Sequence, residues 1–314
     1  MDKIELRIMG GLGNQLYQYS AAKIIQKEYD YPRIDIDTGE YDTYKVRNLE
    51  LNNLIHSENI NFINPSSNSF LWYTIRLFYR IYQRLYHDIT RKHAKQKCFK
   101  FGKNNYLCSS TEFVFPNNLN CNNLYLYGYF VSSSNAICIK KDLMNEVFLN
   151  SYENYDKYNY FLNMIKKTNT IGVSIRCADD YVLNGWPVCS KQFYINGIDI
   201  ISKMKNYDDS DINIMIFADD IKKIKSEKWF IGFKNVTYIE NVSVCESFQL
   251  LRNCNDYVCS NSSFSWWGAF LSYSDNPIII NPNKVFAGEN AVDDNNTFYE
   301  DMILLDYLEG TRIN

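Results

Sequence analysis

The sequence of 314 residues is about twice the length of a typical domain, so we expect two domains. Hydrophobic residues make up 46% of it and charged residues 22%, a composition that supports a sizeable core and excludes a disordered or low-complexity chain. The formal net charge of −3 excludes a general electrostatic attraction to nucleic acid.

The cysteines and histidines argue against a zinc site. None of the nine cysteines forms a Cys-x-x-Cys pair and the chain has three histidines, so the usual ligand sets of zinc are missing. The sequence begins without the apolar stretch of a secretory signal and lacks the run of about 18 apolar residues that a membrane-spanning helix needs. We therefore expect reduced thiols and a cytoplasmic protein.

The amino-terminal segment has the pattern of a βαβ unit. An apolar run at residues 4–9 predicts a strand, and a glycine-rich turn then leads into a helix whose apolar residues recur at helical spacing. Residues 34–37 predict the second strand. This alternation indicates a parallel sheet with crossover helices.

A basic helix is predicted further along the chain. Residues 61–68 have the composition of a loop, and apolar residues at steps of three and four then predict a helix from residue 70 to about residue 97. Residues 69–97 contain seven Lys or Arg residues and one acidic residue, Asp88. One interpretation is the solvated face of an ordinary packed helix. The other is a basic amphipathic helix that rests on anionic lipid, on the inner face of the cytoplasmic membrane.

The second half of the chain repeats the α/β pattern. The domain boundary is expected in a polar segment within residues 145–160, which gives two domains, 1–150 and 151–314. Strands are predicted at residues 170–175, 212–217, 256–259 and 277–280, and helices at residues 191–205, 221–227 and 246–253.

Residues 10–15, Gly-Gly-Leu-Gly-Asn-Gln, lie where a predicted strand gives way to a helix. Backbone amides at such a turn can bind a phosphate or a sugar oxygen. The spacing fails the Gly-x-Gly-x-x-Gly pattern of dinucleotide-binding domains because Gln15 replaces the last glycine. A tight turn explains Gly11 and Gly13, but it leaves Asn14 and Gln15 unexplained.

Arg176 follows the predicted strand at 170–175, and Asp179 and Asp180 come shortly after it. Ligands of α/β sheets bind outside the carboxyl ends of the strands. A guanidinium in that place can bind a phosphate through two parallel hydrogen bonds. The two carboxylates can orient the arginine, accept a proton or hold a sugar hydroxyl, and a structural Arg–Asp pair is the alternative.

Two further motifs follow strands of the second half. Asp219 and Asp220 can bind the hydroxyl groups of a nucleotide or cap a helix. Residues 259–269, Cys-Ser-Asn-Ser-Ser-Phe-Ser-Trp-Trp-Gly-Ala, form the most specific string in the chain. Its hydroxyl and amide groups at a helix start can bind a diphosphate, and simple N-capping is the alternative.

Together these motifs resemble those of glycosyltransferase family 11, the α-1,2-fucosyltransferases. The resemblance runs from residue 3 to about residue 286 and leaves residues 60–120 unmatched. Residues 10–20 resemble the family's GGLGNQ(L/M)(F/Y)QYA signature, residues 174–181 its (H)IRRGDY signature, residues 217–220 a strand that ends in SDD, residues 261–271 the NSSFSWWGAWL stretch and residues 127–130 the GYWQ stretch.

This resemblance implies a GT-B-like fold with two Rossmann-like α/β domains facing a cleft. GDP-fucose would bind the second domain, and the acceptor would bind the first, which carries the basic helix of residues 69–97 as an insert. The implied reaction is metal-independent, inverts the anomeric centre and places L-fucose on the 2-hydroxyl of a terminal galactoside. The acceptor would be a free or lipid-linked intermediate of a surface polysaccharide such as O-antigen or capsule.

The resemblance also implies roles for single residues. Arg176 would hold the donor diphosphate and Asn14 would lie near the transferred sugar. No motif contains a histidine, so the base would be a carboxylate or a water positioned by an amide, or the reaction would proceed without one; Asp179 and Asp180 are the candidates. The donor-binding candidates are Gly11, Gly13, Gln15, Asp219, Asp220, Ser262, Ser263 and Ser265.

The chain departs from the family's IRRGDY signature in three ways. Ser174 replaces the histidine, Cys177 replaces the second arginine, and one extra aspartate follows. One positive charge near the phosphates is therefore expected to be missing. These changes affect the identity of the donor more than the fold.

Three alternatives stay open at this point. Asp35 and Asp37 could hold a divalent ion as the Asp-x-Asp pair of a metal-dependent transferase. The same fold could use a different GDP- or UDP-sugar. The missing histidine and arginine also fit a module that binds glycans or nucleotide sugars without transferring them.

Overall fold

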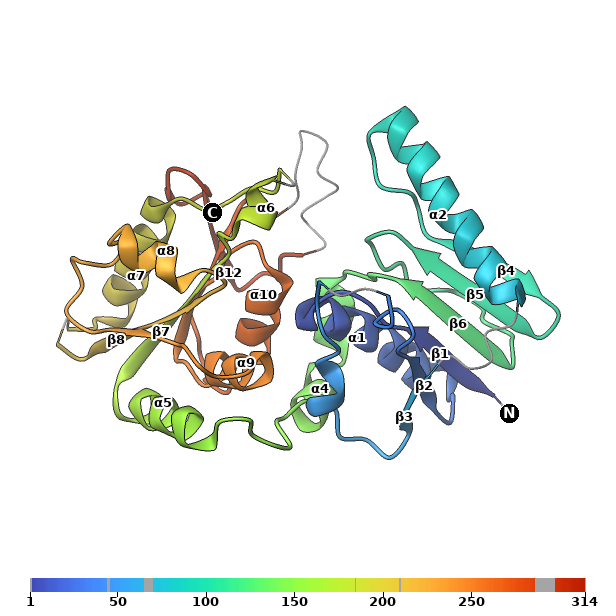
Figure 1. Ribbon diagram of the computed structural model, residues 1–314, viewed down its shortest axis with the longest axis horizontal. Helices are drawn as coiled ribbons and strands as arrows, with labels where there is room; N and C mark the ends of the chain where they lie inside the picture. The colour runs from blue at the N-terminus through green and yellow to red at the C-terminus, as the bar shows by residue number, and fades with distance from the viewer. Residues whose placement is uncertain are drawn as a thin grey trace. The chain divides into compact units, whose positions relative to one another are not determined.

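The computed structural model describes residues 2–43, 46–64, 70–183, 185–208, 210–285 and 297–313. The chain divides into two compact units: the first runs to Phe148 and also includes Thr297, and the second starts at Leu149 and contains the other described residues. Each unit is built around its own six-stranded sheet with helices packed on it (Figure 1). The expected α/β fold class is therefore confirmed.

The first domain has the strand order β3-β2-β1-β6-β5-β4, and among these strands all neighbours are parallel except β4 and β5. The strands are β1 (Lys3–Arg7), β2 (Ile34–Asp37), β3 (Ile60–Ile63), β4 (Lys97–Phe101), β5 (Asn104–Ser109) and β6 (Asn123–Gly128). The helical elements are α1 (Leu12–Tyr29), the 3-10 turn η1 (Leu51–Asn53), α2 (Phe70–Thr90), α3 (Ser133–Cys138) and α4 (Lys140–Glu146).

Two expectations for this domain are wrong. Residues 60–63, expected mostly in a loop, form strand β3, and residues 65–69 of that loop lie outside the described part of the chain. The basic helix ends at Thr90, and β4 starts at Lys97. Strand β4 gave no alternating pattern because it forms an edge of the sheet and nearly all of its residues are exposed.

Gly128 ends strand β6 at a position that excludes any side chain. Its φ of 151° lies in a region that favours glycine, and it pairs with Ser109 at the end of β5. A Cβ atom at this position would stand 2.1 Å from the carbonyl oxygen of Ser109. The close contact between the ends of β5 and β6 therefore requires glycine at position 128.

The second domain has the strand order β12-β11-β10-β7-β8-β9, and all of these neighbours are parallel. The strands are β7 (Asn169–Ile175), β8 (Ile212–Ala218), β9 (Val236–Tyr238), β10 (Asp256–Val258), β11 (Ile279–Pro282) and β12 (Met302–Leu305). The helices are α5 (Tyr155–Lys167), α6 (Asp179–Leu183), α7 (Lys191–Lys205), α8 (Ile221–Ser226), α9 (Val244–Arg252) and α10 (Ser263–Phe270). The four strands and three helices predicted here are confirmed within a few residues.

The topology of this second sheet defines a switch point. From β7 the chain builds β8 and β9 on one side of the sheet, and then β10, β11 and β12 on the other side. This is the strand order of a Rossmann-like domain, whose ligands bind in the crevice between the two strands where the order reverses. Strands β7 and β10 are that pair, with Val173 opposite Val258.

Leu251 of α9 lies against two glycines. A Cβ atom on Gly172 of β7 would stand 2.9 Å from one methyl group of this leucine, and a Cβ atom on Gly268 of α10 would stand 2.5 Å from the other. Leu251 is fully buried. The two glycines therefore allow α9 to pack closely on both the sheet and α10.

Candidate functional site

Polar residues gather where three neighbouring strands of the second domain end. Arg176 follows β7, Asp219 follows β8, and residues 260–263 follow β10. These strands are adjacent in the order β10-β7-β8, and the N–H of Ser260 donates to the carbonyl oxygen of Ser174 at 3.0 Å. The motifs of this half therefore meet at the switch point of the sheet.

The carboxylate of Asp219 organises the loop that carries Arg176. It forms an ion pair with the Arg176 guanidinium and accepts hydrogen bonds from the backbone N–H groups of Cys177 at 2.9 Å and Ala178 at 3.2 Å. Both charged side chains are mostly buried, with 16% of Arg176 and 18% of Asp219 exposed. A charge-assisted pair in such a place holds its geometry better than an exposed one.

Tyr181 completes the surroundings of Arg176. The guanidinium carbon lies 4.9 Å from the centre of the Tyr181 ring, and that ring stacks on Trp186 with 5.8 Å between centres. The Tyr181 hydroxyl donates to the carbonyl oxygen of Asn261 at 3.1 Å. One tyrosine thus connects the arginine loop to the serine-rich turn before α10.

Lys223 adds a second cation that the sequence motifs did not indicate. It lies on α8, and its Nζ donates to the carbonyl oxygen of Cys177 at 3.4 Å. In the sequence, Lys223 is one of several lysines in a predicted helix and has no distinguishing motif. The packing of α8 near the end of β7 places it next to the Arg176 loop. The site contains two positive groups, Arg176 and Lys223.

Cys177 contributes no charge to this site. Its side chain is 1% exposed and packs in the hydrophobic core with Phe193 and Tyr194. Burial, and then the nearby Asp219, raises the pKa of the thiol to about 12, so the thiol stays protonated at neutral pH. An arginine in place of Cys177 would have to leave this core to reach a phosphate.

The serine-rich motif separates into polar and structural positions. Ser262 caps α10 by accepting from the N–H of Phe264 at 3.3 Å, and Ser262 and Ser263 are both partly exposed. Ser265 is fully buried and donates to the carbonyl oxygens of Ser260 and Ser262. Its hydroxyl therefore shapes the turn, and these contacts do not themselves support the donor contact expected of Ser265.

The remaining carboxylates of this half have different surroundings. Asp220 is the N-cap of α8 and accepts from the N–H of Lys223 at 2.9 Å, which is the capping alternative considered from the sequence. Asp179 is exposed at the first position of α6. The side chain of Asp180 lies outside the described part of the chain.

The glycine-rich turn of the first domain surrounds Asn14. Gly10 has a φ of 78°, and a Cβ atom on it would stand 2.9 Å from the side-chain nitrogen of Asn14. Gly11 is the N-cap of α1 and lies against the side chain of Arg47, while Gly13 is buried inside the helix. Asn14 itself is partly exposed. Like Lys223 in the second domain, Arg47 is a cation that no sequence motif predicted.

Gln15 is fully buried and uses both ends of its amide within its own domain. Its nitrogen donates to the carbonyl oxygens of Gly10 and Asn48 and to the Tyr41 hydroxyl, and its oxygen accepts from the N–H groups of Glu50 and Leu51, all at 2.8–3.0 Å. No hydrogen-bonding capacity of the amide is left for a ligand. Gln15 therefore fixes the loop beside the turn, and these contacts do not themselves support the donor contact expected of it.

Both carboxylates of the Asp-x-Asp pair in the first domain form ion pairs with basic side chains. Asp35 accepts from Lys3 at 3.0 Å, and Asp37, which is 1% exposed, accepts from Arg7 at 2.8 and 2.9 Å. Both carboxylates are thus neutralised inside the sheet. Across the described part of the chain, no cluster of three or more His, Cys, Asp or Glu residues suited to a metal is present.

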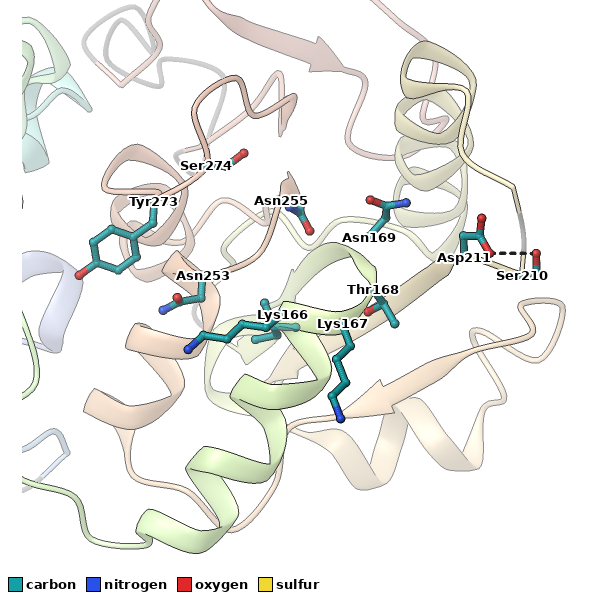
Figure 2. A pocket seen from close by; sticks show the side chains of 11 residues that line it. Lys166, Lys167, Thr168, Asn169, Ser210, Asp211, Asn253, Asn255, Tyr273 and Ser274 are labelled. Carbon is teal, nitrogen blue, oxygen red and sulfur yellow. Dashed lines mark hydrogen bonds between the residues drawn. The ribbon is translucent and has the colours of Figure 1, made fainter.

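A depression of about 680 Å³ lies at the opposite end of the second sheet (Figure 2). Its lining includes Asn169, the first residue of β7, and Lys166 and Lys167 at the end of α5. Asn255, also in the lining, accepts from the backbone and the hydroxyl of Thr170. Because parallel sheets bind ligands at their carboxyl ends, this depression is a weaker candidate than the Arg176 edge.

Comparison with known proteins identifies the family. The sequence profile of glycosyl transferase family 11 matches residues 3–301, nearly the whole chain. The chain belongs to glycosyl transferase family 11. Among the relatives of this family 11 glycosyltransferase, the O-antigen biosynthesis glycosyltransferase WbnK of Escherichia coli is 29% identical, with 90% of this chain and 95% of WbnK covered. An alpha-1,2-colitosyltransferase of E. coli is 27% identical, with 92% and 94% covered.

Solved structures agree with the fold. The fucosyltransferase NodZ from Bradyrhizobium superimposes with a TM-score of 0.50 at 13% identity, over 88% of this chain and 96% of NodZ. NodZ alpha-1,6-fucosyltransferase co-crystallized with GDP gives a TM-score of 0.51 at 12% identity, over 86% and 92%. At these identities the likeness concerns the fold alone, and it supports the GT-B-like class of this family 11 glycosyltransferase.

Proposed function

We propose that this family 11 glycosyltransferase transfers L-fucose from GDP-fucose to the 2-hydroxyl of a terminal galactoside during the assembly of O-antigen or a similar surface polysaccharide. The family match supports glycosyl transfer, and the relative WbnK acts in O-antigen biosynthesis by its name. The observation that carries the proposal is that Arg176, next to Lys223 at the loop after β7, is connected through Tyr181 to the serine-rich turn at the switch point of the second domain.

The proposed mechanism depends on stabilising the departing GDP. As the bond between the sugar and the diphosphate breaks, negative charge grows on the phosphate oxygens. The Arg176 guanidinium and the Lys223 ammonium supply opposite charge there, and the hydroxyls of Ser262 and Ser263 supply further donors. Preorganised groups of this kind need little rearrangement during the reaction, and Asp219 provides that preorganisation for Arg176.

The acceptor hydroxyl attacks the anomeric carbon from the face opposite the diphosphate, which inverts the anomeric centre. Its proton passes to a base late in the reaction, because the transition state has oxocarbenium-ion character. We propose Asp179, exposed three residues after Arg176, as this base. For Asn14 of the first domain we propose a contact with the transferred sugar, which is the role that its family motif implies.

A second candidate donor is GDP-colitose, to be compared with GDP-fucose. One relative is by its name an alpha-1,2-colitosyltransferase, and colitose is a 3-deoxy form of L-fucose. The replacement of the family histidine by Ser174 and of the second arginine by Cys177 also allows a changed donor pocket. GDP-colitose is therefore the second candidate donor.

The proposal is tested with the purified chain, a galactoside acceptor such as lactose, and GDP-fucose, GDP-colitose or UDP-galactose in separate reactions. We expect a product whose mass increases by one fucose only with GDP-fucose, an α-1,2 linkage by NMR, and equal rates with and without EDTA. Transfer from GDP-colitose alone would reassign the donor. Nucleotide-sugar binding without any product would favour the binding module, and loss of activity in EDTA would favour the metal-dependent alternative.

Asp219 and Asp220 provide a matched pair of substitutions. Asp219→Asn weakens the ion pair with Arg176 and one of the backbone hydrogen bonds, so we expect kcat/KM to fall about tenfold. Asp220→Asn keeps a good N-cap, because asparagine and aspartate cap helices about equally well, so its kcat/KM should stay close to that of the unmodified enzyme. Steady-state kinetics of the two variants decide the point. A larger loss for Asp220→Asn than for Asp219→Asn would contradict the assignment.

A further inference from the structure

Helix α2 packs on the first sheet through one narrow face. Trp72, Ile75, Arg76 and Tyr79 are its buried residues. The Trp72 ring lies 5.4–6.3 Å from the rings of Tyr106, Tyr125 and Tyr127 on β5 and β6. Arg76 is 7% exposed and lies 5.3 Å above the ring of Trp72. These contacts fix the rotation of the helix about its axis, with α2 lying along the β4–β6 side of the sheet (Figure 1).

The opposite face of α2 is apolar and exposed. Exposure is 84% at Phe70, 65% at Phe78 and 81% at Ile89, and Leu77, Ile81 and Leu85 are each about half exposed. Their spacing of three, four and seven residues places these six side chains along one stripe of the helix, which we call the outer stripe. A helix at the surface of a water-soluble domain normally presents polar residues on this side. The outer stripe therefore needs a partner that covers apolar groups.

Positive charge surrounds the outer stripe. Arg84 is exposed on α2, Arg80 is exposed and forms an ion pair with Glu40 at 3.1 Å, and further exposed cations follow at the carboxyl end of the helix and on β4. Residues 70–103 contain nine Lys or Arg residues and one acidic residue, Asp88, although the whole chain has 33 Lys or Arg and 36 Asp or Glu. The exposed cations beyond the helix are Arg91, Lys92, Lys95, Lys97, Lys100 and Lys103. An otherwise acidic chain thus concentrates positive charge around its apolar stripe.

We infer that α2 binds the surface of an anionic lipid bilayer, with the outer stripe inserted at the level of the acyl chains and the surrounding cations against the headgroups. A helix that combines a wide apolar face with flanking lysines and arginines lies in the membrane interface, and its affinity increases with apolar area and with anionic lipid. No helix in the described part of the chain has the length and hydrophobicity needed to span a bilayer. Peripheral attachment is therefore the mode of binding.

A second copy of the chain fits this face less well. Pairing two outer stripes would bring two sets of cations together with Asp88 as the acidic residue of each segment, and like charges at such a distance repel. A bilayer that contains anionic lipid offers acyl chains to the outer stripe and negatively charged headgroups to the cations. This inference is independent of the donor and of the reaction.

The test is co-sedimentation of the full chain with vesicles of phosphatidylglycerol and phosphatidylethanolamine, and with vesicles of phosphatidylcholine. We expect binding to the anionic vesicles that weakens at high salt, and little binding to phosphatidylcholine. The double variant Phe78→Gln/Leu85→Gln should lower the partition coefficient at least about tenfold. Lys92→Glu/Lys95→Glu should weaken binding and reduce its dependence on salt.

The matched control is Ile231→Gln/Met204→Gln, which removes two exposed apolar side chains from the second domain, 76% and 51% exposed. It should bind anionic vesicles like the unmodified chain. Circular dichroism and thermal unfolding of each variant establish that the fold is intact. Equal binding to both kinds of vesicle, no binding to either, or a loss in the control Ile231→Gln/Met204→Gln equal to that in Phe78→Gln/Leu85→Gln would overturn the inference. Sedimentation velocity that finds a dimer dissociated by Phe78→Gln/Leu85→Gln would also overturn it, in favour of a subunit interface.

Discussion

Replacing Arg176 by lysine is expected to lower kcat/KM for glycosyl transfer by about a hundredfold while the fold stays intact. Lysine keeps the positive charge but loses the planar fork that binds two phosphate oxygens at once. It also loses the stacking of the guanidinium over Tyr181, which lies 4.9 Å away. Weaker contact with the diphosphate should appear in calorimetry as an increase of about tenfold in the Kd for GDP.

Arg312→Lys is the matched control, because it makes the same change at an exposed position of the same domain. Its kcat/KM and its affinity for GDP should stay unchanged. If Arg176→Lys kept its fold and more than about a third of the turnover, the proposed role of Arg176 at the diphosphate would be wrong.

Gly128→Ala should destabilise the first domain by about 3–5 kcal/mol. The added Cβ atom would stand 2.1 Å from a backbone oxygen, so relief requires β5 and β6 to separate at their ends rather than a side chain to rotate. Alanine is also strained at a φ of 151°. Hydrogen exchange measured by mass spectrometry should find faster exchange in the strands of the first domain and little change in the second.

Gly102→Ala separates the clash from the loss of a glycine. Gly102 also has a positive φ, 61°, but a Cβ atom on it would meet no atom within 4 Å. Its substitution should therefore cost only about 1–2 kcal/mol. Equal effects of the two substitutions would contradict the importance of the contact with Ser109.

Much of the second domain could be predicted because local signals and tertiary structure agree there. Helix α7 spans the predicted residues, since Ser190 caps its start through the N–H of Phe193 and Asn206 ends it in a left-handed conformation. Strands β7 and β8 are apolar for most of their length and buried at nearly every position, as expected where helices cover both faces of a parallel sheet. The edge that carries Arg176 and Asp219 follows from the rule that such sheets bind ligands at the carboxyl ends of their strands.

The details of the site depend on contacts that spacing does not record. The residues next to Gln15 in the sequence do not show whether its amide is free to bind a ligand. In the structure that amide is hydrogen-bonded to a loop more than thirty residues away. Cys177 occupies the place of a family arginine but lies in the core, and the second cation comes from Lys223 on another helix. In α2, the apolar residues at helical spacing belong to two different faces of the helix. Trp72 and Tyr79 are buried against the sheet, whereas Phe78 and Leu85 are exposed.

The contact of Leu251 with Gly172 and Gly268 has a consequence for how sequences of this fold can diverge. Leu251 limits the size of the residue at both glycine positions, and Cys254 limits it at Gly172 as well, so the effects of substitutions at these four positions are expected to depend on one another. Within the string of residues 259–269, Gly268 therefore depends on a leucine of α9, whereas Ser262 and Ser263 lie at the start of α10 and are not limited by that leucine. The two parts of this signature are therefore free to change separately: a homologue that keeps the Trp-Trp-Gly half and loses Ser262 and Ser263 would keep this packing and, on the proposed function, lose part of its donor site.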